Sequence, residues 1–109
     1  MIEFDPPSPE LVAELKEKHG DDMREVEDGE RVFILVKPER PRPHLERMTT
    51  MAGNDKKRLE AAEGLVKACC VYPDKDTFKR VLFDEPGLAL SLGEHAMELL
   101  GMRQLTAKK

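Results

Sequence analysis

Apolar residues recur every three or four positions from residue 59 to residue 101, which is the spacing of one helix face. Breaks at Tyr72-Pro73-Asp74 and at Asp84-Glu85-Pro86-Gly87 divide this region into three helices. The predicted buried positions are Leu59, Ala62, Leu65, Val66 and Cys69, then Phe78, Val81 and Leu82, then Leu88, Leu92, Ala96 and Leu99 or Leu100. We expect these helices to supply most of the core and the upstream chain to cover it.

Short polar residues and prolines predict where the helices begin. Ser8 followed by Pro9 predicts an N-cap and a first helical position, and His19-Gly20 predicts the end of that helix. A second helix is predicted from His44 to Ala52, with Gly53 after it. The predicted caps of the last three helices are Asn54 or Asp55, Asp74, and Asp84-Glu85-Pro86.

The hydrophobic period changes to two between Asp22 and Pro38, around an Asp28-Gly29 hairpin signal. The outgoing strand is apolar on both faces, with Val32, Ile34 and Val36 on one side and Phe33 and Leu35 on the other. An isolated hairpin is marginal in water, so the helices must cover one face, and more chain or a partner must cover the other. We therefore predict that Phe33 and Leu35 lie at a client interface or at an interface for self-association through the hairpin.

Three prolines between Pro38 and Pro43 predict an extended, polyproline-like connector. It is interpreted as a stiff spacer, with a recognition peptide for an aromatic groove as the alternative. The helix after it carries Met48 and Met51, whose flexible thioethers suit an adaptable groove for a partner helix. A role as filler of gaps in the core is an equally good interpretation of the two methionines.

The length of 109 residues fits one domain. Of these residues 39% are hydrophobic and none is Trp, which favours helices over a β-sandwich. The sequence predicts a single, predominantly helical α+β domain over residues 1–101, with one N-terminal β-hairpin and four to five helices. A flexible C-terminal tail is expected at residues 102–109.

Charge is distributed unevenly along the chain, whose net charge is −4. Residues 1–30 carry 11 acidic and 3 basic side chains, whereas residues 31–60 carry 4 acidic and 8 basic ones. The acidic first third would repel phosphate, so nucleic acid is not expected as a partner. A membrane is not expected either, because no apolar run approaches the length of a span. Without a leader at Met1, the chain is predicted to be cytoplasmic.

The sequence offers no recognisable catalytic, cofactor or metal constellation, and an enzyme is not expected. Cys69 and Cys70 are adjacent, which is the wrong spacing for a zinc knuckle or a thioredoxin-type pair, and both are predicted to lie in the core. The three histidines are scattered, and the glycines stand singly rather than in a phosphate loop. We therefore expect the protein to act by binding another protein.

The order of these signals resembles the small tail assembly proteins of long-tailed bacteriophages and prophages. The resemblance rests on a helix closing at His19-Gly20, the Asp28-Gly29 hairpin, the break at Val71-Tyr72-Pro73-Asp74 and Pro86-Gly87-Leu88 before the last helix. It implies a tail assembly chaperone that binds the tape-measure protein in the host cytoplasm. It also implies a minor, longer form made by frameshifting, for which codons of Lys108-Lys109 offer a site; a plain basic tail is the alternative.

A second class of function fits the same composition. A small phage or bacterial regulator would inhibit its target by protein–protein binding through the acidic N-terminal third, with salt-sensitive kinetics. Retention of a tape-measure fragment during purification would separate the chaperone from this regulator.

Overall fold

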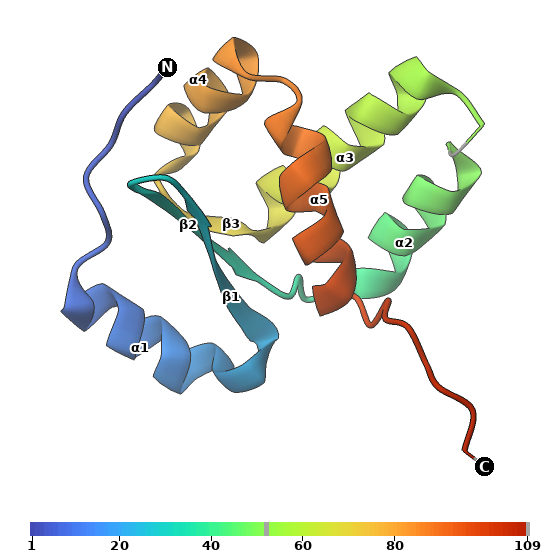
Figure 1. Cartoon of the computed structure of the whole chain (residues 1–109), viewed down its shortest axis with the longest axis horizontal. Helices are drawn as coiled ribbons and strands as arrows, with labels where there is room; N and C mark the ends of the chain where they lie inside the picture. Colours follow the sequence, from blue (N-terminus) through green and yellow to red (C-terminus); the bar gives the residue numbers. More distant parts are fainter. Residues whose placement is uncertain (52, 109) are drawn as a thin grey trace.

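A computed structural model describes residues 1–51 and 53–108, and it shows a small α+β domain (Figure 1). Ala52, predicted at the end of the second helix, and Lys109, in the predicted tail, lie outside the described residues. The described elements are α1 (Pro9–His19), η1 (Gly20–Asp22), β1 (Met23–Asp28), β2 (Arg31–Val36), α2 (Pro41–Thr50), α3 (Asp55–Cys69), β3 (Cys70–Tyr72), α4 (Lys75–Asp84) and α5 (Leu88–Leu99).

Helices α1, α3 and α4 begin at the polar N-cap residues that the sequence predicts. The Ser8 hydroxyl accepts a hydrogen bond from the N–H of Leu11 at 3.1 Å, and the side chains of Asn54 and Asp74 accept from backbone N–H groups of α3 and α4. Each cap satisfies one of the donors that the first turn leaves without an intrahelical partner. Helix α1 ends at Gly20, whose φ of 55° lies in the region that glycine adopts without steric cost.

The predicted connector from Pro38 to Pro43 is wrong in its second half, because α2 already begins at Pro41. Proline is normally excluded from helix interiors since it lacks an N–H. Pro41 and Pro43 occupy the first turn, where N–H groups have no intrahelical acceptor, so neither costs a hydrogen bond. Two prolines that look like a break therefore start the helix.

The hairpin prediction is confirmed only in part, because a third strand extends it into a sheet of order β1-β2-β3. Strand β1 pairs with β2 along its whole length, from Met23 opposite Val36 to Asp28 opposite Arg31. Strand β3 is antiparallel to β2 and pairs only at Ile34 and Leu35. With three residues directly after α3, β3 is too short to show a period of two in the sequence.

The start predicted for the last helix also needs correction. Helix α5 begins at Leu88, and the residue before it, Gly87, makes no side-chain cap. The Glu85 carboxylate accepts hydrogen bonds from Arg31 instead of capping the helix. A long-range ion pair thus takes the side chain that the local pattern assigns to a cap.

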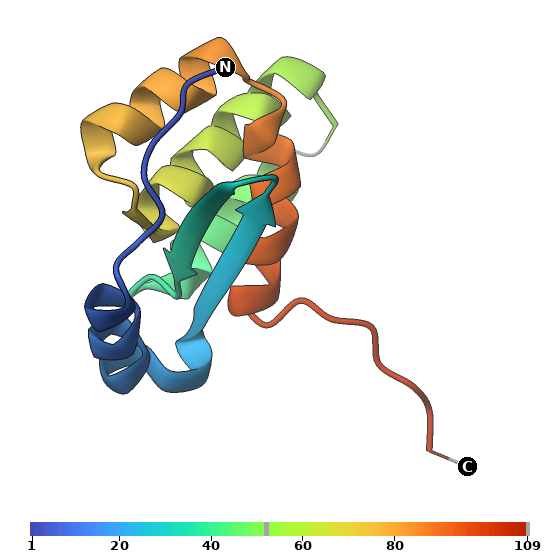
Figure 2. The same cartoon turned by 60° about the vertical axis from the view of Figure 1, so that its left-hand side comes forward.

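One face of β2 belongs to the main core, together with α3, α4 and α5 (Figures 1 and 2). Phe33 and Leu35 pack there with the predicted apolar positions of the three helices. The predicted stripes are confirmed: Ala62, Leu65, Val66, Cys69, Phe78, Val81, Leu82, Leu92, Ala96 and Leu99 are buried, and Leu59, Leu88 and Leu100 pack against them. Ile34 and Val36, on the opposite face, are buried as well.

The chain after α5 leaves the domain, as Figure 2 shows. Residues 102–108 contain no helix or strand, and all of them are exposed. Among the described residues, no helix has the length and apolar character needed to cross a membrane.

Candidate functional site

The structure places Phe33 and Leu35 inside the folded monomer, with no accessible surface on either side chain. The prediction that they form a client or self-association interface is therefore corrected for the folded chain. The strand has no polar face because both of its faces are covered from within the molecule. The helices cover Phe33 and Leu35, and Ile34 on the other face is also fully buried.

The N-terminal segment, residues 1–7, covers part of that apolar strand, and we call it the strap. It runs from α1 past the β1–β2 hairpin toward α4 (Figure 2). The Phe4 ring packs edge-on against Phe33 at 5.3 Å and against Tyr72 at 6.0 Å between ring centroids. Strand β3 pairs only at Ile34 and Leu35, and the strap contacts the first half of β2 through the side chains of Arg31 and Phe33.

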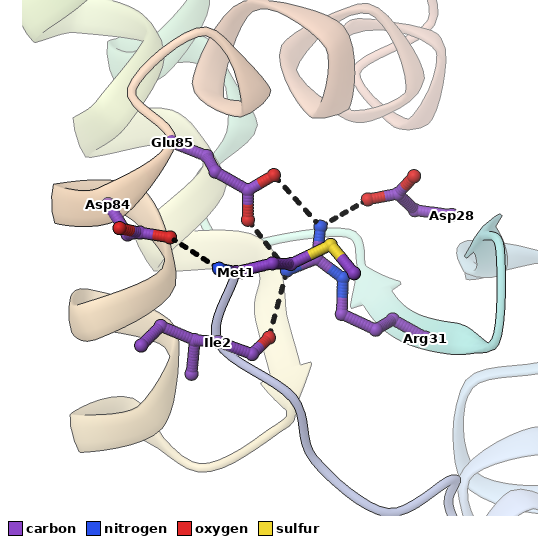
Figure 3. A network of polar contacts seen from close by, with 6 residues as sticks. All are labelled: Met1, Ile2, Asp28, Arg31, Asp84 and Glu85. Carbon is purple, nitrogen blue, oxygen red and sulfur yellow. Dashed lines mark hydrogen bonds and ion pairs between the residues drawn. The ribbon is translucent and has the colours of Figure 1, made fainter.

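A buried arginine at the start of β2 holds the strap in place (Figure 3). The Arg31 side chain is only 3% exposed, and its guanidinium donates to the Ile2 carbonyl at 3.1 Å and to Glu85 at 2.8 Å. It also pairs with Asp28. Burial alone would lower the pKa of Arg31, but hydrogen bonds and attraction from Glu85 and Asp28 outweigh it and raise that pKa. The network is permanently charged and joins the start of β2, the end of β1, the α4–α5 turn and the strap.

The predicted methionines lie elsewhere, on and after α2. Met48 is half-buried and packs against the main core, and Met51 follows the last turn of α2. A cavity of about 380 Å³ lies between α2 and the end of α5, and its lining residues include neither methionine. Because Phe33 and Leu35 have no exposed surface, they cannot form one binding surface with Met48 and Met51.

An aromatic side chain that the sequence analysis did not select is the most exposed large apolar residue described. Phe83 is 92% exposed near the end of α4. Helix α4 turns Phe78, Val81 and Leu82 into the core, and a residue directly after Leu82 points about 100° away from it. Phe83 follows Lys79 by four residues, so it lies on the wet face of the helix.

Beside Phe83 runs a surface depression between α3 and α4, which we call the α3–α4 groove. Its first part, a cavity of about 640 Å³, reaches from α3 to the start of the strap, and its second, of about 280 Å³, continues toward β3. Lys67 of α3 and Lys79 of α4 line both parts. The other lining residues are Ile2, Glu63, Arg80, Leu82, Phe83, Asp84 and Pro86 in the first part, and Ala68, Cys70, Lys75 and Phe78 in the second.

Basic side chains outnumber acidic ones along the α3–α4 groove. Lys67, Lys75, Lys79 and Arg80 are all exposed, and none of them takes part in an ion pair among the described residues. Of the two acidic lining residues, Asp84 already pairs with the N-terminal amine of Met1 at 3.6 Å. The groove thus combines an exposed aromatic ring, an apolar floor and unneutralised positive charge.

Cys70 is the lining residue of this groove with a thiol side chain. Desolvation raises the pKa of Cys70 to about 12 and that of its neighbour Cys69 to about 11, so both thiols stay protonated near neutral pH. The three histidines lie on α1, α2 and α5, and the described residues contain no cluster of three metal-ligating side chains.

Comparison with known proteins gives a family for this chain. Residues 13–109 match the sequence model of a domain of unknown function, DUF6848. The chain belongs to this family. The match leaves out the strap and the start of α1, so the matched region begins within α1 and includes every lining residue of the α3–α4 groove named above except Ile2.

A solved structure shares the fold of this DUF6848 chain. It is that of the uncharacterised protein rbstp2171 from Bacillus stearothermophilus, at a TM-score of 0.65 and 24% identity. The similarity covers 90% of this chain and 99% of the other, and at that identity it supports the fold alone. No curated protein matches the sequence.

Proposed function

We propose that this domain is a non-catalytic binding protein that holds an apolar helical segment of another protein. The observation that carries the proposal is Phe83, an aromatic ring at 92% exposure beside a groove between two helices. A buried ring of this size is worth roughly 1.5–3 kcal/mol of hydrophobic free energy, so leaving it in water favours a partner that covers it. Helices commonly bind in such grooves through apolar anchors spaced three or four residues apart.

The more specific form of the proposal is a tail assembly chaperone, with the tape-measure protein as its client in the bacterial host cytoplasm. It rests on the resemblance at His19-Gly20, Asp28-Gly29 and Pro86-Gly87-Leu88. Long helical proteins expose apolar stripes until they assemble, and a small domain with one open aromatic anchor can cover such a stripe temporarily. The α3–α4 groove replaces Phe33 and Leu35 as the proposed contact surface.

Co-expression with the long helical reading frames encoded nearby in the same genome tests this function. The intact chain should co-purify with a tape-measure protein, and Phe83→Ser should lose most of the captured client while keeping the same circular dichroism spectrum. Leu105→Ser is the matched control, because Leu105 is an equally apolar and exposed residue in the tail. No retention of any tape-measure protein, or equal retention by Phe83→Ser, would refute the proposal.

Met48 and Met51 stay a predicted second contact. Methyl NMR on the same complex addresses them directly: shifted methionine signals at saturating client would support a contact through α2. Unmoved signals would assign Met48 to the core alone, against which it already packs.

The regulator alternative has its own supporting observation in the acidic first third. Glu25 and Glu27 are exposed on β1, an edge strand of the sheet, and Asp21 and Asp22 are exposed just before it. An acidic strand edge can pair with a basic target. Under this alternative, Glu25→Lys/Glu27→Lys would abolish partner binding and Phe83→Ser would not.

A further inference from the structure

The α3–α4 groove has a charge pattern that restricts which helix can fill it. Lys75, Lys79 and Phe83 follow one another at intervals of four residues, so they form one ridge along α4. At 1.5 Å per residue, Lys79 lies about 6 Å and Lys75 about 12 Å from Phe83 along the helix axis. Lys67 faces this ridge from α3, since it lines both parts of the groove with Lys79.

The two ends of the groove differ in chemistry. At the end near β3, the ionisable side chains of the lining are Lys67, Lys75, Lys79 and the protonated Cys70, above an apolar floor that includes Phe78. At the other end, the apolar residues Phe83, Ile2 and Pro86 and the two acidic residues of the groove lie beside Lys67, Lys79 and Arg80. A ligand therefore meets lysines along the whole groove, no acidic side chain among the described residues at the end near β3, and an aromatic anchor at the other end.

We propose that the α3–α4 groove binds an acidic amphipathic helix, whose carboxylates face Lys67, Lys75 and Lys79 while an apolar side chain one or two turns away packs on Phe83. This inference rests on the proposed function and specifies the partner's chemistry. Charge complementarity carries it, because unpaired lysines at a groove favour an acidic partner and disfavour a basic one.

Titration of the full-length protein with designed helical peptides tests the inference. The first peptide is a 20-residue amphipathic helix with Leu on one face and Glu along both borders, and two companions carry Gln or Lys in place of every Glu. Binding is followed by backbone amide NMR shifts and by calorimetry at low and high salt. We expect the Glu peptide to shift signals of α3 and α4, the Gln peptide to bind at least tenfold more weakly, and the Lys peptide not to bind.

Two double charge-reversal variants distinguish the effect of the groove lysines on affinity from the effect of the protein's net charge. Lys67→Glu/Lys79→Glu should weaken binding of the Glu peptide at least tenfold. Lys56→Glu/Lys57→Glu changes the net charge equally at the start of α3, outside the groove, and should leave the affinity within twofold. Phe83→Ala should weaken binding of both the Glu and the Gln peptides.

Each other outcome overturns a stated claim. Equal binding of the Glu and Gln peptides, with no effect of Lys67→Glu/Lys79→Glu, would overturn the acidic specificity and leave the proposed apolar function standing. Failure of all three peptides to bind would overturn both. Stronger shifts of the same signals by a decauridine oligonucleotide or by anionic phosphatidylserine vesicles would replace the helix with a polyanion as the ligand.

Discussion

Two phenylalanines on neighbouring parts of the fold end in opposite environments. Phe33 on β2 has no exposed surface, whereas Phe83 on α4 is 92% exposed. Helices and the strap cover Phe33, and the strap residue Phe4 comes from 29 positions earlier in the chain. No described element covers Phe83. An apolar side chain therefore marks an interface only when no distant segment of its own chain covers it.

The largest expected effect comes from placing a carboxylate in each environment. Leu35→Asp would bury an unpaired charge and remove a core contact, a loss of more than about 5 kcal/mol that exceeds the stability of many small domains. Phe83→Asp should change the free energy of unfolding by less than about 0.5 kcal/mol, because water reaches the site. Chemical denaturation of both variants measures the contrast. A cooperatively folded Leu35→Asp would contradict the assignment of β2 to the core.

A smaller effect is expected when the cover of β2 is loosened. Arg31→Met keeps an apolar stem but loses the hydrogen bonds to Ile2 and Glu85 and the ion pair with Asp28. Asp28 and Glu85 are partly exposed and can recover water, so the expected cost is about 2–3 kcal/mol rather than that of a fully buried pair. The strap should detach, which increases binding of an apolar fluorescent dye.

Arg42→Met is the matched control for that variant. Arg42 pairs with Glu46 on the surface of α2, where the loss of an exposed ion pair costs less than about 0.5 kcal/mol. Equal losses of stability in the two variants would mean that Arg31 does not hold the strap.

The sequence predicts which residues are apolar better than it predicts what covers them. Local caps and the helical stripes were sufficient to place α1, α3 and α4, because their determinants lie within a few residues of each other. The three-residue β3 and the bonds from Arg31 to Glu85 depend on contacts between distant segments. Phe83 lies off the stripe that Phe78, Val81 and Leu82 form, so the sequence pattern alone indicates that its ring is exposed.

The buried thiol of Cys69 and the half-buried thiol of Cys70 extend the comparison to alkaline pH. The folded protein holds the pKa of Cys69 at about 11 and that of Cys70 at about 12, against an ordinary value of 9.0. Above pH 9 the unfolded chain releases protons that the folded chain retains, so stability is full below pH 9 and is lost as pH rises toward 11–12. The loss attributable to Cys69 is on the order of 2 kcal/mol.

Denaturation curves at pH 8 and pH 10.5 measure this loss. A Cys69→Ala/Cys70→Ala variant should show a shallower decline than the parent, since other groups that titrate in this range, including Tyr72, are common to both. Identical declines would indicate that the thiols are already accessible to water in the folded state.

The central claim is that the open aromatic of α4, rather than the covered strand, meets the partner. Site-specific photo-crosslinking tests it most directly, with p-benzoylphenylalanine placed at Phe83 or, as a control of similar exposure, at Leu105 in the tail. With the proposed client, a tape-measure protein, co-expressed, position 83 should give a crosslinked product with the client and position 105 should give little. Crosslinks from position 105 alone, or from neither position while the two proteins still co-purify, would contradict the claim.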